Sequence, residues 1–277
     1  MERPSQRSHR SQRSSSGESG QAVVEAALIL PAMIFLILCI LQLTLLQQAR
    51  LMVEYAAFSA ARAGVVHNMD NGAKSPIGAV DGPMRDAAVW SILPSFARTD
   101  SFASLGAARL RYEAQDTLMR AAGLPQIRVA VLNPHVADFN ALGAHLNRQE
   151  IDFDDVRPQA QGATLLSLQV RYLFELKVPF ANKMVQSIWF ASQVGLLRLW
   201  QGVDLTSPRI GGQRGQDAVE RTGNVALGRG TLNDGMPGGL NVSALATLSR
   251  RNRFFLPVNA WYTMRLQSNP FKKWAAP

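Results

Sequence analysis

The chain has 277 residues and a formal net charge of +9 at pH 7. A basic chain suits anionic partners such as nucleic acid or lipid headgroups. Its Arg residues are scattered apart from one dense block at 250–253 (RRNR), which argues against nucleic acid and for a protein beside an anionic bilayer. The single cysteine, Cys39, excludes an intrachain disulfide and a thiolate metal site, and its apolar surroundings make it a small apolar filler.

Residues 1–20 are mostly Ser, Arg, Gln and Gly, with almost no apolar side chain. Such a segment cannot bury a core, so we expect a disordered basic leader. It is richer in arginine than the residues just after the apolar run, which offer Arg50 and Arg62 against Glu54. The positive-inside rule therefore predicts that the N-terminus stays in the cytoplasm and that the C-terminal domain is exported to the periplasm.

An apolar run follows the leader and contains no charged residue from Ala26 to Ala49. Because a helix rises about 1.5 Å per residue, roughly 20 apolar residues cross a hydrocarbon core of about 30 Å. The apolar region of a cleaved secretory signal is only about 7–15 residues long, which argues against an ordinary signal peptide. Helix formers continue beyond the run until Gly64 and the NMDNG segment at 68–72. We predict one helix over 21–66, half in the lipid bilayer and half a stalk under a globular head.

Gly20 and Glu25 stand five positions apart at the start of this helix. A glycine before a scissile bond has no side chain to obstruct a narrow protease site, and it lowers helix propensity so that leader and helix stay distinct. A carboxylate at the edge of hydrocarbon is costly unless it is paired, which predicts a function for Glu25. Cleavage after Gly20 would create a partner for it, the new α-amino group of Gln21, one helical turn away.

Pro31 lies inside the apolar run. It removes one backbone hydrogen bond, so it predicts a kink in the transmembrane helix. Membrane helices tolerate proline when neighbouring helices satisfy the freed carbonyl. Prolines are also common in membrane helices without any particular role, and this alternative stays open.

The segment GQAVVEAALILP at 20–31, the apolar run and AARAG at 60–64 resemble the TadE-like family of the tight-adherence (Flp) pilus system. The C-terminal PVNAWYTMRLQSNPF resembles endings of the same family. The resemblance implies a leader that ends in Gly20, processing between Gly20 and Gln21 by a prepilin peptidase, and a role for Glu25 in subunit packing. It also implies partners: other pilin-like or pseudopilin subunits and the inner-membrane pilus or secretion platform. Some relatives keep their leader, so an uncleaved form is the alternative.

The remaining chain, 67–277, predicts a periplasmic α+β head with a small, mainly antiparallel sheet and packed helices. The helix at 180–201 is apolar but interrupted by polar residues, which leaves a second membrane span, a core-packed helix and a membrane-surface helix open. In the last case Trp189, Phe190 and Trp200 are the candidate interface contacts. The patterns predict helices at 84–92, 104–122 and 180–201, strands at 126–132, 164–178 and 254–267 (with a break at Pro257 left open for the last), and a flexible Gly-rich loop at about 202–252.

The sequence offers no catalytic, cofactor-binding or metal site. His135, Asp138 and His145 have no metal-ligand spacing. The acidic segment 152–155 (DFDD) lacks the glycine and closing glutamate of a calcium loop, and the glycines at 211–216 lack the residues of a phosphate-binding loop. We therefore expect a protein without a cofactor that is not an enzyme.

Together these patterns predict a TadE-like pilus assembly protein, a minor pseudopilin or its uncleaved relative, that acts by helix-mediated assembly in the bacterial inner membrane. It would be a single-pass protein with a cytoplasmic N-terminus. The alternative is a membrane-anchored periplasmic enzyme or ligand-binding domain unrelated to pili. That alternative requires polar residues clustered in a pocket.

Overall fold

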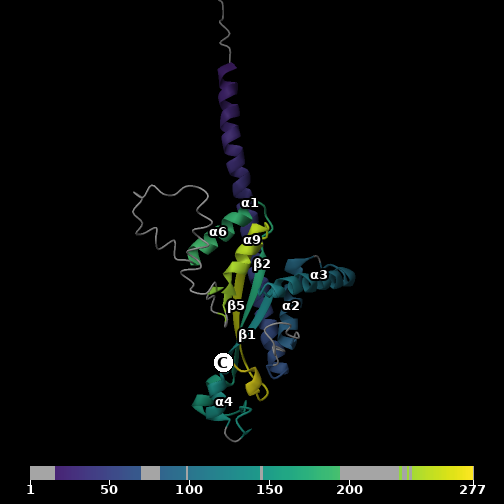
Figure 1. Ribbon diagram of the computed structural model, residues 1–277, viewed down its shortest axis with the longest axis vertical. Coiled ribbons are helices and arrows are strands. Elements are labelled where there is room, and N and C mark those ends of the chain that lie inside the picture. The colour runs from purple at the N-terminus through teal and green to yellow at the C-terminus, as the bar shows by residue number, and fades with distance from the viewer. Residues whose placement is uncertain are drawn as a thin grey trace, which may run out of the picture.

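The computed structural model describes residues 16–69, 82–97, 99–143, 146–193, 231–232, 236 and 239–276. It confirms an α+β chain with one long N-terminal helix (Figure 1). The elements are α1 (Ser16–Val66), α2 (Pro83–Phe96), α3 (Phe102–Ala121), β1 (Ile127–Asn133), α4 (Val136–Leu142), α5 (Pro158–Ala163), β2 (Leu165–Glu175), α6 (Ala181–Gln193), β3 (Thr231–Leu232), β4 (Leu240–Asn241), α9 (Val242–Arg250), β5 (Phe255–Arg265) and a 3₁₀ turn at Lys272–Trp274.

The head is built on a three-stranded sheet in the order β1-β2-β5, antiparallel throughout. The central strand β2 pairs Val170 with Val129 of β1 and with Ala260 of β5. β5 runs unbroken through Pro257, so the interruption considered for this strand is wrong. Proline is tolerated there because β5 is an edge strand and needs no second row of backbone donors.

The second half of α1 packs along one face of this sheet, over β2 and β5, with α2 beside it over β1. From Gln42 onward, the half of the helix predicted as a stalk packs against the head. Figure 1 shows the first part of α1 standing clear of the other elements at one end of the head. The second half of α1 packs on the sheet because it turns small residues toward it.

Small side chains line the contact between α1 and the sheet. Ala56, Ala57, Ala60 and Ala61 have no exposed surface. Gly64 has no room for any side chain, because a Cβ there would lie 2.8 Å from Leu166 Cδ2 and 3.1 Å from Met84 Sδ. The AARAG segment at 60–64 is thus explained by close packing of the α1 backbone on β2 and α2.

A second, smaller core lies where α6 and α9 meet the sheet. Leu173 of β2 belongs to it, whereas its neighbours Tyr172 and Phe174 belong to the main core. Successive residues of a strand point to opposite faces, so the sheet is covered on both sides here. Leu245 of α9 and Phe255 of β5 complete this contact.

Several predicted boundaries change in the structure. α1 begins at Ser16, not at residue 21, so its backbone is helical across Gly20. The predicted loop at about 202–252 contains α9, which Asn241 caps by accepting a hydrogen bond from the Ala244 N–H at 3.1 Å. Residues 202–230 of that predicted loop, the leader up to residue 15 and the helical residues predicted at 194–201 lie outside the described residues.

Replacing Gly64 with leucine should destabilise the head. The added side chain must displace Leu166 and Met84 in a packed core, a change that costs about 1–3 kcal/mol. Gly106 of α3 is the matched control, because a Cβ added there would meet nothing within 4 Å and leucine improves helix propensity by up to about 1 kcal/mol. We expect Gly64→Leu to lower the Tm of the detergent-solubilised chain and Gly106→Leu to leave it equal or higher; equal Tm values would contradict the packing described.

Candidate functional site

The first part of α1 is exposed around its whole circumference. Residues 23–37 are all exposed, and Gln42 is the first buried residue of the helix. The 19 residues from 23 to 41 rise about 28 Å, close to the thickness of a hydrocarbon core. Among the described residues, one helix is long and apolar enough to cross a bilayer, and it is this one. Leu, Ile and Val on every side of a helix are unfavourable in water and favourable in lipid.

Glu25 lies in this exposed segment, on the same helical surface as Ala26, Ile29 and Met33. It makes no hydrogen bond or ion pair with any described residue. Gly20 and Gln21 lie in the same helix about one turn earlier. The structure therefore brings the three predicted processing and assembly residues onto one end of one helix.

α1 is continuous across Pro31. The kink predicted there stays a prediction. Proline leaves the carbonyl four residues earlier, on Ala27, without its helical donor. Residues 23–37 are exposed in the described part of the chain, so no donor for this carbonyl is evident among the described residues.

Gln42 marks the level at which α1 enters the head. Its side chain is fully buried, and its Oε1 accepts a hydrogen bond from the Val178 N–H at 2.9 Å. Val178 follows β2, so this bond fixes the start of the β2–α6 connection to the base of the exposed segment. The sequence signal for this contact is a lone amide within an apolar run, and it was not among the predicted site residues.

A hollow of ≈ 170 Å³ lies near this base, lined by Leu45, Gln48, Pro94, Ser95, Phe174 and Lys177. Pockets for small molecules are usually larger, about 300–1,000 Å³, and combine an apolar lining with several converging polar groups. The hollow therefore gives no support to the alternative of an enzyme or ligand-binding domain.

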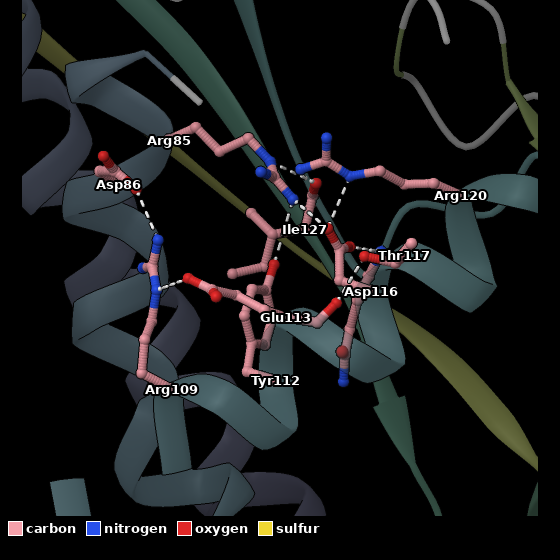
Figure 2. A network of polar contacts seen from close by, with 10 residues as sticks. Arg85, Asp86, Arg109, Tyr112, Glu113, Asp116, Thr117, Arg120 and Ile127 are labelled. Carbon is pink, nitrogen blue, oxygen red and sulfur yellow. Dashed lines mark hydrogen bonds and ion pairs between the residues drawn. The ribbon is translucent and has the colours of Figure 1, made fainter. Parts of the chain in front are cut away.

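The most extensive polar contacts in Figure 2 join α2, α3 and β1 through the carboxylate of Asp116. Asp116 Oδ2 accepts hydrogen bonds from Arg85 Nη2 at 2.7 Å and Arg120 Nε at 2.6 Å, and Oδ1 accepts from the Gln126 N–H at 2.9 Å. Arg85 also donates to the Tyr112 hydroxyl at 3.2 Å and to the Ile127 carbonyl at 3.3 Å. A carboxylate held by three donors is an anchor between elements.

Two buried tyrosines border this network. Burial raises the pKa of Tyr112 above its ordinary value, and it raises the pKa of Tyr172 to about 12. Both hydroxyls therefore stay protonated at neutral pH, which suits them to hydrogen bonding within the core. The sequence analysis missed this network. Its sequence signal is Tyr112 and Asp116, four residues apart on the buried face of α3.

The residues rejected as metal ligands have structural roles. Asp138 accepts a hydrogen bond from the His135 N–H at 2.8 Å and caps α4. Asp155 pairs with Arg157. His145 lies outside the described residues, and among those described no three of His, Cys, Asp and Glu gather closely enough to hold a metal ion. The expected absence of a cofactor stays a prediction.

Residues 20–62 match the model of the TadE-like protein family. The match begins at Gly20 and ends within AARAG, so it confirms the resemblance seen in the sequence. It covers 43 of the 277 residues, all of them in α1. No curated protein and no solved structure matches the chain. The TadE-like match supports involvement in tight-adherence pilus assembly in general, and it leaves the role of the head to be argued from its structure.

Removing the Asp116 carboxylate should destabilise the head strongly. Its side chain is 6% exposed, and Asp116→Ala leaves the buried Arg85 guanidinium without its anion, which costs about 3–5 kcal/mol. Glu113→Ala on the same helix is the control, since Glu113 is 49% exposed and its pair with Arg109 contributes about 0–1 kcal/mol. Thermal unfolding of the detergent-solubilised variants measures the difference, and a similar small loss in both would contradict an anchoring role for Asp116.

Proposed function

We propose that this chain is a TadE-like pilus assembly protein, a minor pseudopilin or its uncleaved relative, that acts by helix-mediated assembly in the bacterial inner membrane. The observation that carries the proposal is the two-part construction of α1. Its first part is apolar on every side and about as long as a bilayer is thick, and its second part is packed into the head. Displacement of the membrane segment is thus transmitted directly to the head.

Glu25 is the group that turns a membrane anchor into an assembly element. A carboxylate at the edge of hydrocarbon is costly without a cationic partner, and no described residue of the chain supplies one. In the uncleaved chain α1 begins at Ser16, so Glu25 lies beyond the first turn, where the helix dipole would lower that cost. The α-amino group of Gln21, on the same or a neighbouring subunit, would supply the partner after cleavage behind Gly20.

Processing by a prepilin peptidase requires the backbone around Gly20 to enter a protease site. In the structure this backbone is helical, so it has to unwind locally before cleavage. Glycine makes this easier, because it stabilises a helix by about 1 kcal/mol less than alanine does. The N-terminal leader would remain cytoplasmic, and the head would lie in the periplasm, in agreement with the charge distribution around the span.

Determining the N-terminus of the protein from native membranes tests the processing step. We expect the intact mass of a chain that starts at Gln21 when the prepilin peptidase is present and of one that starts at Met1 when it is deleted. A chain that starts at Met1 in both strains would make the protein an uncleaved, permanent membrane component, and processing between Gly20 and Gln21 would be wrong.

Glu25→Gln tests the assembly role, because it keeps the shape of the side chain and removes its charge. We expect recovery of pilin-like subunits crosslinked to the protein to fall roughly tenfold or more, the loss expected for a charge-assisted hydrogen bond. The Tm of the head should not change, since Glu25 contacts no part of it. Glu54→Gln is the control on the same helix, where Glu54 pairs with Arg50 at 3.2 Å in an exposed position. Unchanged crosslinking in Glu25→Gln would contradict the proposal.

A further inference from the structure

α6 carries an apolar stripe on the face turned away from the head. Phe180, just before the helix, and Met184 and Ile188 within it are 75%, 39% and 55% exposed. Met184 and Ile188 are four residues apart, so they share one side of the helix, and Phe180 stands directly before its first turn. The opposite side carries Val185, which packs on the main core, and the buried Gln186.

Trp189 and Phe190 pack against the smaller core, with their rings 5.0 Å apart. Both are only partly buried there, so their membrane contact stays a prediction, and Trp200 lies outside the described residues. The helix has the amphipathic pattern that its sequence predicts, but the head takes the side that contains the large aromatic residues. What remains exposed is the stripe of Phe180, Met184 and Ile188.

This stripe lies at the end of the head from which the exposed part of α1 emerges. The hydrogen bond from the Val178 N–H to Gln42 Oε1 holds the start of α6 at the level where α1 becomes fully exposed. Gln186 Nε2 donates to the Phe255 carbonyl at 3.0 Å, which fixes α6 to the first residue of β5. Figure 1 shows α6 running away from α1 across this end of the head.

Basic residues lie on α6, just before it and at the end of the neighbouring α9. Lys177 and Lys183 are exposed next to the stripe on the chain. Ser249 Oγ donates to Gln186 Oε1 at 2.8 Å, so the end of α9, with the exposed Arg250 and Arg251, lies beside the inner side of α6.

Glu175 is an acidic residue at this end of the head, and its charge is compensated. Arg253 donates to both of its carboxylate oxygens, each at 2.8 Å. The exposed charge contributed by Lys177, Lys183, Arg250 and Arg251 is therefore positive, which is complementary to anionic lipid headgroups.

We propose that the outer face of α6 lies on the surface of the bilayer that α1 crosses. Phe180, Met184 and Ile188 enter the boundary between headgroups and acyl chains, and the four cations bind anionic headgroups. Helices with an apolar face and flanking Lys and Arg bind in this way, with the apolar face buried about 5–10 Å deep. The inference rests on the proposed membrane insertion of α1, because the Gln42–Val178 bond then places α6 at the height of the headgroups.

Membrane contact of α6 would fix the orientation of the head. α1 alone holds the head at the right distance from the bilayer but leaves it free to rotate about the helix axis. A second contact, made by a helix that runs away from α1, removes this freedom. The competing occupant of the stripe is an apolar helix of another pilin-like subunit, and the experiment separates the two.

Spin labels on single cysteines of the full-length chain, in a Cys39→Ala background, measure the depth of each position in lipid. Leu36→Cys reports the insertion of α1, Met184→Cys and Ile188→Cys report the stripe, and Leu118→Cys on α3, 72% exposed, is the aqueous control. The chain is reconstituted without other proteins into vesicles of phosphatidylcholine mixed with phosphatidylglycerol. Accessibility to oxygen and to a water-soluble nickel complex gives the depth.

We expect Leu36 to lie in the hydrocarbon, Met184 and Ile188 at its boundary and Leu118 in water. Met184 and Ile188 in water while Leu36 is in the hydrocarbon would overturn the α6 proposal and leave the membrane span intact, and the stripe would then be open to another subunit. Leu36 in water would contradict the span itself, and with it both the proposed function and the inference built on it.

The role of the cations is tested in the same vesicles with the Ile188→Cys label. Lys183→Gln and Arg251→Gln should each lower the ratio of membrane-bound to free label roughly fivefold, the effect of one cation near an anionic surface. Arg111→Gln, which removes an exposed cation from α3, should leave the ratio unchanged. If Lys183→Gln and Arg251→Gln gave the same ratio of membrane-bound to free label as Arg111→Gln, the electrostatic part of the proposal would be overturned. Lys183, Arg251 and Arg111 are exposed, and an unchanged Tm verifies that the head is folded.

Discussion

The contact between the small-residue face of α1 and the sheet is the interaction on which the head depends. Alanines bury little area each, so the apolar surface removed from water at this contact comes mainly from the large side chains of β2, such as Leu166, Leu168 and Val170. The contribution of α1 is to let the two backbones approach. The helix accordingly changes composition near Gln42: before it, large apolar residues point in all directions, and after it one face becomes small.

The hydrogen bonds of Asp116 fix the position of α3. α3 lies outside α2 and contacts the sheet only in part, so apolar burial alone fixes it weakly. Taking Arg85 and Asp116 out of water costs several kcal/mol, which their attraction and hydrogen bonds offset. We infer that the pair contributes geometry more than net stability, because the hydrogen bonds of Arg85 and Asp116 form together only when α2, α3 and β1 hold one arrangement.

The parts of the fold that follow from local pattern were predictable. A continuous stretch of sequence shows the pattern of each of these elements: the span of α1, the helix α3 and the alternating strands β2 and β5. α9 was not predicted, because the Gly-rich residues around it masked the pattern of a helix with an Asn241 cap. Gly20 did not end α1, because helix formation is cooperative and the turns on both sides of it are stable. The buried pair Arg85–Asp116 joins residues 31 positions apart, and no local pattern reveals such a partnership. The same limit applied to α6, where the pattern showed two faces and only the fold decided which one the head covers.

Glu25 lies near the start of the spanning segment and Gln42 at its end. Gln42 is hydrogen-bonded to the head, whereas Glu25 has no partner among the described residues. Gln42 is bound by the head and fixes the lower limit of the span. Glu25 lies 17 residues, or about 26 Å, away and is left for a partner outside the described chain. Between them, Pro31 removes a helical donor from the Ala27 carbonyl, so the upper half of the span has two unmet polar requirements. Under the proposed function, a neighbouring helix with an amine and a polar side chain would satisfy both. The end of α1 nearer to the head is already bound by it, and the farther end would take its partner from another helix.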